Sequence, residues 1–414
     1  MEGTAESYDP LWQSLLPVGR DPSTGGYHRL AYSPAELACR EWFITAAVQR
    51  DLEVETDRNG NLWAWWTGPW GGASDGAALV IGSHLDSVRD GGAFDGPLGV
   101  VSAFAAIDAV RARGRAPRRP VAVAAFAEEE GARFGIACAG SRLATGALDP
   151  DRARALRDES GVTLARALTA AGLDPSHLGR DEERLRGIGA FVELHIEQGR
   201  GLVDLDAPVG LASGIWPHGR YRFTFSGEAN HAGTTLMADR RDPVQAWSRT
   251  AIAAATAATT YDARATFGRL DVHPNSTNAV PSRVRAWLDA RAGDEQTLQR
   301  LLGDVGDAAA EAARQTRTTV DVTPESFSPA VFFDEALHER IAGALETSDG
   351  DALPVLPTAA GHDAGVLASA GVPTAMLFVR NPTGVSHSPA EYADRADCLA
   401  GVAALTRTIE VLAS

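Results

Sequence analysis

The chain has 414 residues, too many for one ordinary hydrophobic core, and its length predicts two domains or one domain with a large insertion. Hydrophobic residues make up 44%, as in soluble globular proteins, and 54 Asp and Glu against 38 Lys and Arg give a net charge of −16. This negative field disfavours nucleic acid and anionic membrane surfaces as partners. The acidic start lacks the apolar core of a secretory signal and no apolar run is long enough to span a bilayer, so we expect neither export nor membrane insertion.

The cysteines bear on the compartment and on one possible chemistry. Cys39, Cys138 and Cys398 are odd in number and widely spaced, which predicts buried, reduced thiols of a cytoplasmic protein rather than a disulfide framework. Cys138 lies near a run of carboxylates and is a candidate nucleophile. A small packing residue is the competing interpretation, and it is the one that we favour.

The first half of the chain alternates predicted helices with predicted strands. Apolar residues recur at helical spacing before Arg50, and two continuous apolar runs further on are typical of fully buried strands. In chain order we predict a helix over 33–50, two strands around the Asn59-Gly60 turn within 54–66, a strand over 77–82, a helix over 99–111 and a strand over 121–126. Polar residues follow both buried strands, which is where ligands bind in open α/β sheets.

The pattern changes twice in the second half. Residues 150–187 mix Arg, Asp, Ala and Leu, which predicts solvated amphipathic helices without a nucleic-acid role. From about Gly210 an α+β pattern follows, with strands over 220–225, 267–270, 283–290 and 318–322 and Ala-rich helices over 242–261 and 298–314. The α/β pattern returns at Phe333 and includes a strand over 374–379.

These elements predict an α/β fold in which a central, mostly parallel sheet is flanked by helices and a second, α+β domain is inserted. We predict that residues 1–212 and 330–414 form one discontinuous domain. Residues 213–329 form the inserted domain, whose length is that of a small independent domain.

His84, at the end of a predicted buried strand within Gly82-Ser83-His84-Leu85-Asp86, stands out among the histidines because of its neighbour Asp86. Asp86, two residues on, can accept the other ring N–H and fix the tautomer that faces a metal ion. Ordinary polar roles are the simpler interpretation of four further histidines, His28, His177, His273 and His338.

Asp95 lies in the glycine-rich segment Gly91-Gly92-Ala93-Phe94-Asp95-Gly96. Glycines on both sides allow the backbone to approach closely, which suits a carboxylate that bridges two cations. A simple glycine turn explains the segment equally well. A phosphate cradle is a third interpretation, but the spacing fits neither a P-loop nor a dinucleotide fingerprint.

The carboxylate run Glu128-Glu129-Glu130-Gly131 follows the second buried strand directly. Like charges at a strand end cost free energy unless a cation neutralises them, and the apolar lead-in argues against a simple surface charge run. A metallohydrolase needs one carboxylate on the metal and a second, unligated one that takes a proton from the activated water.

Two further histidines complete the candidate ligands, His195 in His195-Ile196-Glu197-Gln198-Gly199 and His387 in Ser386-His387-Ser388. The set is too small for two separate closed sites but sufficient for two ions that share one carboxylate and keep positions open for water. Open coordination distinguishes a catalytic metal site from a structural one. Mixed nitrogen and oxygen ligands suit Zn²⁺ and tolerate Mn²⁺.

In this order, the five motifs resemble the dinuclear aminoacylase/carboxypeptidase superfamily, and most of all its hydantoinase/carbamoylase amidase branch, over nearly the whole chain. The resemblance implies that Glu129 is the general base, that Glu130 binds metal and that Glu128 is a bystander. It also implies two divalent metal ions, Zn²⁺ or Mn²⁺, one on His84 and His195, the other on Glu130 and His387, with Asp95 bridging them.

The same resemblance assigns roles to the inserted domain, as a lid and dimerisation domain, and to the substrate pocket. His231, in Gly227-Glu228-Ala229-Asn230-His231-Ala232-Gly233, would reach the partner subunit's site in a homodimer and stabilise the oxyanion of the tetrahedral intermediate. An arginine fork would hold a substrate carboxylate in bidentate geometry. The implied substrate-binding residues are Gln198, Arg220, Asn278, Arg291 and Gly361.

The function that the resemblance implies is hydrolysis of a non-peptide C–N bond in a small ureido or N-carbamoyl acid, allantoate first and N-carbamoyl-L-amino acids second. His195 favours this branch, because peptidase relatives usually supply a carboxylate there. A dipeptidase or aminoacylase on the same scaffold is the alternative enzyme. A non-catalytic metal-binding protein is the alternative of another class, and the presence of Glu129 with all five ligands disfavours it.

Two departures from the family's pattern concern the pocket. Leu236 stands where the family commonly has proline, and Trp216-Pro217-His218 is bulkier than the common sequence. Both bear on which substrate is accepted more than on the chemistry.

Overall fold

The computed structural model describes residues 2–67, 77–346 and 352–413, and the chain divides into two compact units. Unit 1 comprises Met1–Ser213 and Phe332–Ser414, and unit 2 comprises Gly214–Val331. The sequence pattern had put the two divisions after residues 212 and 329.

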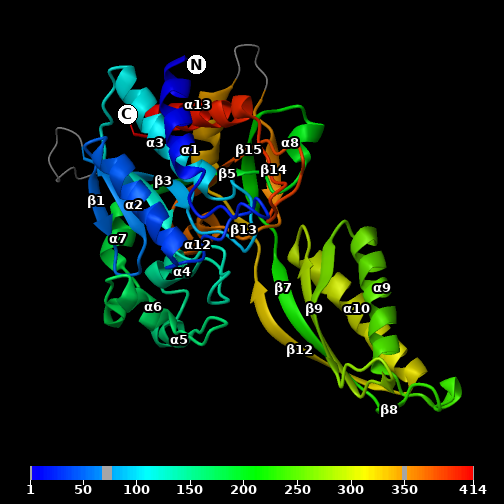
Figure 1. Ribbon diagram of the computed structural model, residues 1–414. Coiled ribbons are helices and arrows are strands. Elements are labelled where there is room, and N and C mark those ends of the chain that lie inside the picture. The colour runs from blue at the N-terminus through cyan, green and yellow to red at the C-terminus, as the bar shows by residue number, and fades with distance from the viewer. Residues whose placement is uncertain (1, 68–76, 347–351, 414) are drawn as a thin grey trace. The chain divides into compact units, whose positions relative to one another are not determined.

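Unit 1 is built on a nine-stranded sheet in the order β1-β2-β4-β3-β5-β15-β6-β13, with β14 paired to β6 (Figure 1). The central strands β4, β3, β5 and β15 run parallel, and the flanking pairs β1/β2, β2/β4 and β6/β15 are antiparallel. The strands are β1 Glu53–Thr56, β2 Leu62–Trp66, β3 Ala78–His84, β4 Val121–Phe126, β5 Ile188–Ile196, β6 Val209–Ile215, β13 Val331–Phe332, β14 Val355–Thr358 and β15 Thr374–Val379. The predicted α/β class with a mostly parallel sheet is confirmed.

Helices cover this sheet because alternate strand residues face opposite sides. Leu79 and Ile81 of β3 and Val192 and Leu194 of β5 join the core made with α1, α2, α3 and α13, while α12 packs on β5 and β15 beside α4. The helices of unit 1 are α1 Glu2–Leu15, α2 Pro34–Val48, α3 Pro97–Ala112, α4 Ala139–Thr145, α5 Pro150–Ala155, α6 Leu164–Ala170, α7 Glu182–Gly187, α8 Gly201–Asp204, α11 Glu335–Leu345, α12 Asp363–Ser369 and α13 Arg395–Leu412.

The sequence pattern found β3, β4 and β15 but missed β5, which carries His195. A buried carboxylate, Glu193, interrupts its apolar run and hides the strand signal. Hydrogen bonds offset the burial of Glu193, since its carboxylate accepts from Ser83 Oγ at 2.7 Å and from the Ala364 N–H at 3.0 Å. The region 150–187, predicted to be helical, contains three short helices, α5 to α7, and one 3₁₀ turn.

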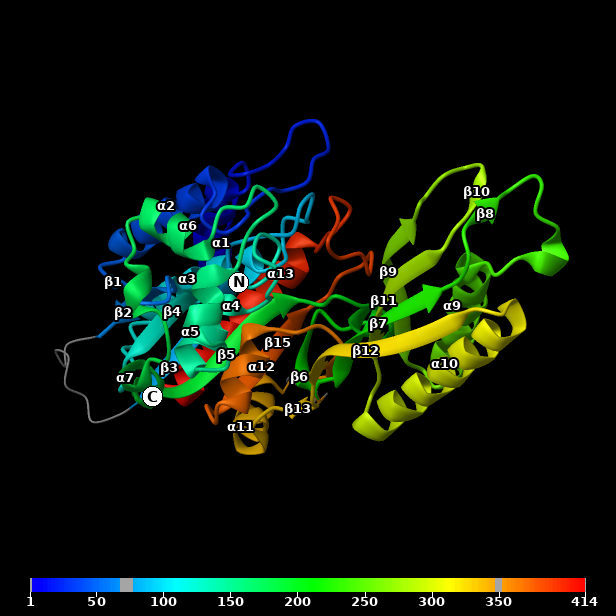
Figure 2. The ribbon, with the colours of Figure 1, turned by 90° about the horizontal axis from the view of Figure 1, so that it is seen from below.

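Unit 2 contains a four-stranded antiparallel sheet, β12-β7-β11-β9, with α9 and α10 packed side by side against it (Figure 2). Its core lies between the helices and the alternate strand residues Phe223, Phe225, Val284 and Leu288. The elements are β7 His218–Ser226, β8 Asn230–His231, α9 Pro243–Thr260, β9 Arg264–His273, β10 Ala279–Val280, β11 Arg283–Arg291, α10 Glu295–Thr316 and β12 Thr319–Ser328. Among the residues described in both units, no helix combines the length and apolar character needed to cross a bilayer.

Candidate metal centre

The candidate metal ligands come from segments that end at one edge of the unit 1 sheet. His84 is the last residue of β3 and His195 the last but one of β5, and these two strands are parallel neighbours. The carboxylate run follows β4, on the other side of β3. Asp95 precedes α3 and His387 follows β15. Parallel strands bring their carboxyl ends together, so motifs far apart in the sequence meet here.

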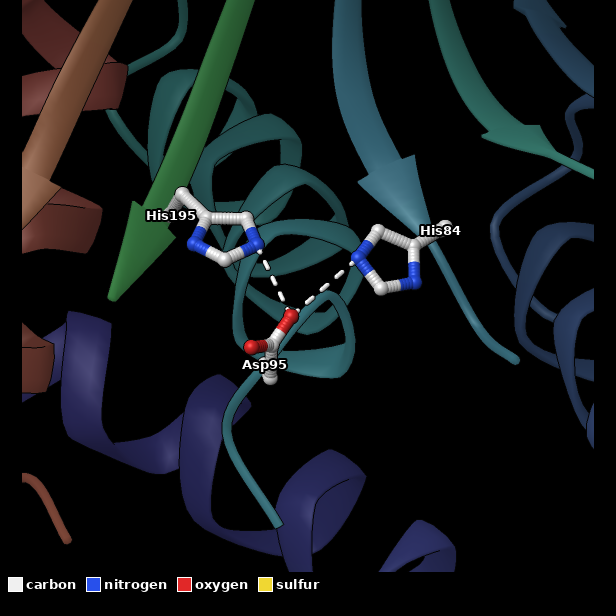
Figure 3. A group of neighbouring side chains, drawn as sticks. All are labelled: His84, Asp95 and His195. Atoms are coloured by element: carbon white, nitrogen blue, oxygen red, sulfur yellow. Dashed lines mark ion pairs between the residues drawn. The ribbon is translucent and has the colours of Figure 1, made fainter. Parts of the chain in front are cut away.

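His84, Asp95 and His195 form one fully buried group of candidate ligands (Figure 3). Asp95 Oδ1 lies 3.4 Å from His84 Nε2 and 3.2 Å from His195 Nε2. Both Nε2 atoms are buried and have no hydrogen-bond partner. Two unpartnered imidazole nitrogens that converge on one carboxylate oxygen are the donors that Zn²⁺ and related divalent ions prefer. The residues therefore fit a cation.

The other ring nitrogen of each histidine contacts a main-chain carbonyl. His84 Nδ1 lies 3.1 Å from the carbonyl oxygen of Asp86, and His195 Nδ1 lies 2.8 Å from that of Ile196. A carbonyl can only accept, so these contacts assign the ring proton to Nδ1 and leave the lone pair of Nε2 directed at the site.

Asp86 therefore differs from its predicted role. Its carboxylate was expected to accept the His84 ring N–H, but Oδ1 is 3.6 Å from Nδ1, farther than the main-chain oxygen. The carboxylate accepts instead from the main-chain N–H groups of Glu129 and Glu130, both at 3.2 Å. Asp86 thus holds the segment that carries the two glutamates.

A second group consists of Asp95, Glu130 and His387. His387 Nε2 lies 3.3 Å from Glu130 Oε2 and 3.7 Å from Asp95 Oδ2, so the two oxygens of Asp95 face different groups. The His387 side chain is 51% exposed, whereas those of His84 and His195 are 0% and 1% exposed. The second position is therefore the more open one.

Glu129 is buried beside the first group, with Oε2 3.7 Å from His84 Nε2. Burial raises the pKa of Glu129 well above its ordinary value, against the opposing effect of His84 and with the help of Asp363. A carboxylate with a raised pKa is suited to accept a proton.

Cys138 donates a hydrogen bond from Sγ to Glu129 Oε1 at 3.2 Å. Burial raises the pKa of its thiol well above the ordinary value, with a further contribution from Glu129. Nucleophilic attack needs the thiolate, so this environment argues against the nucleophile interpretation.

The other two glutamates of the run point in different directions. Glu128 adopts a positive φ of 52°, and its Oε1 accepts from the main-chain N–H groups of Arg133 at 3.2 Å and Phe134 at 2.6 Å. Glu130 faces His387, and burial together with Asp95 raises the pKa of Glu130 to about 8.

Burial acts against ionisation of Asp95 as well, but His195 and His84 outweigh this effect and hold the pKa of Asp95 well below the ordinary value. A cation near Glu130 would relieve the repulsion between the carboxylates.

The His84 ring packs against the main chain of Gly96, where a side chain would not fit. Its φ is +82°, and a Cβ there would lie 2.4 Å from His84 Cε1. We expect Gly96→Ala to displace the His84 ring and weaken metal binding about tenfold or more, in a titration of the metal-free protein with Zn²⁺. Gly172 is the matched control, with φ +83° and no atom within 4 Å of its Cβ position. Gly172→Ala should cost only the backbone strain of about 1–2 kcal/mol, and equal Zn²⁺ affinities for the two variants would contradict the prediction.

The oxyanion residue expected from the sequence, His231, lies in unit 2 on β8 and is exposed. Its Nδ1 accepts from the main-chain N–H groups of Gly233 at 3.1 Å and Thr234 at 3.2 Å. Nδ1 must therefore be unprotonated in the neutral ring, and the proton lies on Nε2. Asn278 lies near His231, because the main-chain carbonyl of Asn278 accepts a hydrogen bond from the Ala232 N–H at 2.9 Å.

The two expected arginines share one carboxylate in unit 2. Asp289 Oδ1 accepts from Arg291 Nε at 2.7 Å, Asp289 Oδ2 accepts from an Arg291 terminal nitrogen at 3.1 Å, and Arg220 Nε lies 3.4 Å from Oδ2. The fork predicted to hold a substrate carboxylate is thus already paired with Asp289. Gly361 belongs to unit 1 and is exposed, and Gln198 Nε2 donates to Asp95 Oδ2 at 2.8 Å.

Sequence reasoning missed two residues around these ligands. His362 is buried with both ring nitrogens unpartnered, its ring centroid is 4.6 Å from that of His195, and it forms a third candidate ligand group with His195 and Glu193. Glu391 is buried and contacts the main chain of Asp95. The signal available in the sequence was, for His362, its position next to Gly361, and for Glu391, its position four residues after His387.

The comparisons with known proteins agree with the motifs. A profile of peptidase family M20/M25/M40 matches residues 80–411. An N-carbamoyl-L-amino acid amidohydrolase from Geobacillus stearothermophilus is 36% identical over 408 residues, which cover 97% of this chain and 98% of the relative. An allantoate amidohydrolase from Escherichia coli K12 is 34% identical over 408 residues, 96% of each chain. The crystal structure of an amidase of the hydantoinase/carbamoylase family from Burkholderia multivorans superposes with a TM-score of 0.84 at 30% identity, over 98% of each chain. The resemblance is confirmed, and the chain belongs to peptidase family M20/M25/M40.

Proposed function

We propose that the protein is a metal-dependent amidohydrolase that cleaves a non-peptide C–N bond of a ureido acid, with allantoate or an N-carbamoyl-L-amino acid as the substrate. The observation that carries this proposal is the pair of unpartnered Nε2 atoms of His84 and His195 on Asp95 Oδ1. The imidazole at 195, where peptidase relatives usually have a carboxylate, favours the amidase branch. Full-length relatives named as amidohydrolases of N-carbamoyl-L-amino acids and of allantoate support the substrate class.

We infer two divalent cations, Zn²⁺ or Mn²⁺. His84, His195 and Asp95 would hold the first, and Glu130, His387 and Asp95 the second, in agreement with the two ligand groups that share Asp95. Such cations supply activation of the attacking water and polarisation of the scissile carbonyl.

The chain's own residues supply proton transfer. Glu129 is unligated in this assignment and lies beside His84. It takes a proton from the attacking water and delivers it to the leaving nitrogen. With a ureido substrate the products would be ammonia, carbon dioxide and the amine-bearing acid.

Residues of unit 2 would complete the pocket in a homodimer. His231 of one chain would donate its Nε2–H to the oxyanion in the partner's site. The residues proposed to hold the substrate are Gln198, Arg220, Asn278, Arg291 and Gly361. We propose the cytoplasm as the compartment, because all three cysteines are unpaired and buried, as in proteins of reducing compartments.

Ammonia release tests the proposal. Protein stripped with a chelator is reconstituted with Zn²⁺ or Mn²⁺ and offered allantoate, a panel of N-carbamoyl-L-amino acids and a panel of dipeptides. We expect no ammonia from the stripped protein and metal-dependent release from a ureido acid, since the cation activates the water.

The remaining outcomes of this assay contradict the proposal in different ways. Metal-dependent cleavage of dipeptides without ammonia release would favour a peptidase. Inactivity on every substrate, with metal shown to be bound, would favour a non-catalytic metal-binding protein.

A further inference from the structure

Glu391 links two loops that carry candidate metal ligands. It is buried, and its Oε1 accepts from the main-chain N–H groups of Phe94 at 2.8 Å and Asp95 at 3.0 Å. Asp95 and Glu391 are 296 residues apart in the sequence. Glu391 belongs to the loop of His387, so its carboxylate ties the Asp95 loop to the His387 loop.

Ser386 makes a second connection between the same loops. Its Oγ donates to Asp95 Oδ2 at 3.0 Å and lies 3.4 Å from Glu391 Oε2. Glu391 therefore holds the main chain of Asp95, and Ser386 holds one oxygen of its side chain.

Gly92 shows how closely the two loops approach. A Cβ at this position would lie 2.2 Å from Glu391 Oε1, so only glycine leaves room for the carboxylate. The glycine-rich segment, which fitted a turn or a metal bridge equally well from the sequence, is thus shaped in part by Glu391.

The two ligand groups depend on this link to different degrees. In the first group, His84 and His195 lie at the ends of β3 and β5, which the sheet holds in place. In the second group, Asp95 and His387 both lie on loops, and the His387 side chain is half exposed. Without Glu391 we expect Oδ1 to stay near the two strand-borne histidines that converge on it. Oδ2 would keep its contacts with Ser386 and Gln198 but would be placed less precisely relative to His387.

We propose that Glu391 is a positioning residue that fixes Asp95 relative to His387 and thereby sets the affinity of the second cation position. The inference rests on the cation assignment within the proposed function but not on the identity of the substrate. Residues that orient metal ligands typically change metal affinity 10- to 100-fold when they are replaced.

The test compares Glu391→Ala and Glu391→Gln with the wild type and with Asp57→Asn. Asp57 is the matched control, since it is also buried and its Oδ1 accepts from two main-chain N–H groups, of Asn59 at 2.8 Å and Asn61 at 2.9 Å, neither of which is a candidate ligand. Metal-free full-length protein is titrated with Zn²⁺ against a chromophoric chelator, and thermal unfolding is followed in parallel.

We expect the wild type to bind two equivalents. Glu391→Ala should bind the first with an affinity within a few-fold of the wild type and the second at least about tenfold more weakly. The affinity of Glu391→Gln for the second equivalent should lie between those of the wild type and Glu391→Ala, because its amide oxygen can still accept hydrogen bonds from the two N–H groups. Asp57→Asn should lower the unfolding temperature and leave both affinities unchanged.

Three results would overturn the inference: one equivalent bound by the wild type, two bound with unchanged affinity by Glu391→Ala, or parallel loss of both equivalents in Glu391→Ala and Asp57→Asn. If Glu391→Ala does not fold, wild-type affinities in Glu391→Gln overturn it equally. The titration contains no substrate, so absence of ammonia release would contradict the proposed function and leave this result standing.

Discussion

Glu129→Gln is expected to lower kcat for ammonia release by about 10²- to 10⁴-fold while both cations still bind. The amide has nearly the same shape as the carboxylate but cannot take a proton from water. Glu129 is buried, with Oε2 3.7 Å from His84 Nε2 and Oε1 accepting from Cys138, so its position beside the first ligand group is constrained. Steady-state ammonia release and Zn²⁺ titration of the same preparations separate chemistry from metal binding.

Glu128→Gln is the matched control for this prediction. Glu128 neighbours Glu129 in the sequence and is also buried, but its Oε1 accepts from the main chain of Arg133 and Phe134. We expect this variant to lose stability and to keep kcat within a few-fold of the wild type. A Glu129→Gln enzyme that keeps more than about a tenth of wild-type kcat would contradict the assignment of Glu129 as the base.

That the metal ligands lie close together could be predicted, because polar residues at the ends of two apolar runs indicate it. The first continuous apolar run becomes β3, whose last residue is His84, and the second becomes β4, which the glutamate run follows. Neighbouring parallel strands end at one edge of the sheet. His195 was a candidate ligand from the sequence, but its pairing with His84 came from the resemblance, because no strand had been predicted to carry it. The strand that carries His195 was hidden, since Glu193 breaks the apolar run, and the hydrogen bonds that Glu193 accepts from Ser83 and Ala364 offset its burial.

The contacts that hold the metal ligands in place could not be predicted, because they depend on main-chain atoms and on loops distant in sequence. Asp86 was expected to orient His84 through its carboxylate, but its main-chain oxygen is the nearer partner. The position of Glu391 four residues after His387 does not reveal its role, since its partners are two N–H groups 296 and 297 residues away.

The pairing of Arg291 could have been foreseen. Asp289 and Arg291 are two residues apart on β11 and therefore point to the same face of the sheet, where opposite charges pair. A substrate carboxylate that uses Arg291 must share its guanidinium with Asp289 or displace that carboxylate. Resemblance alone did not reveal this competition.

His231→Ala is expected to lower kcat by about 10²- to 10³-fold, the effect of removing one oxyanion donor. The structural reason lies in the ring itself. Two main-chain N–H groups, of Gly233 and Thr234, donate to Nδ1, so the neutral ring carries its proton on Nε2. His231 is exposed, and the proposed function places its Nε2 donor in the partner's site.

Subunit mixing decides whether that site belongs to the partner. In a His231→Ala/Glu129→Gln hybrid dimer, one site would have both residues intact and the other neither, so mixing two inactive proteins should restore about a quarter of wild-type activity. A mixture of Glu129→Gln with His84→Ala is the control, because Glu129 and His84 both serve the site of their own chain, so each site of the hybrid dimer keeps one defect. Subunit exchange is first demonstrated by light scattering with a size-tagged copy. Recovery of activity in the control mixture would then contradict the shared site, and so would the absence of recovery in the first mixture. Recovery in the first mixture alone would require two chains per catalytic unit, because neither variant holds a complete site by itself.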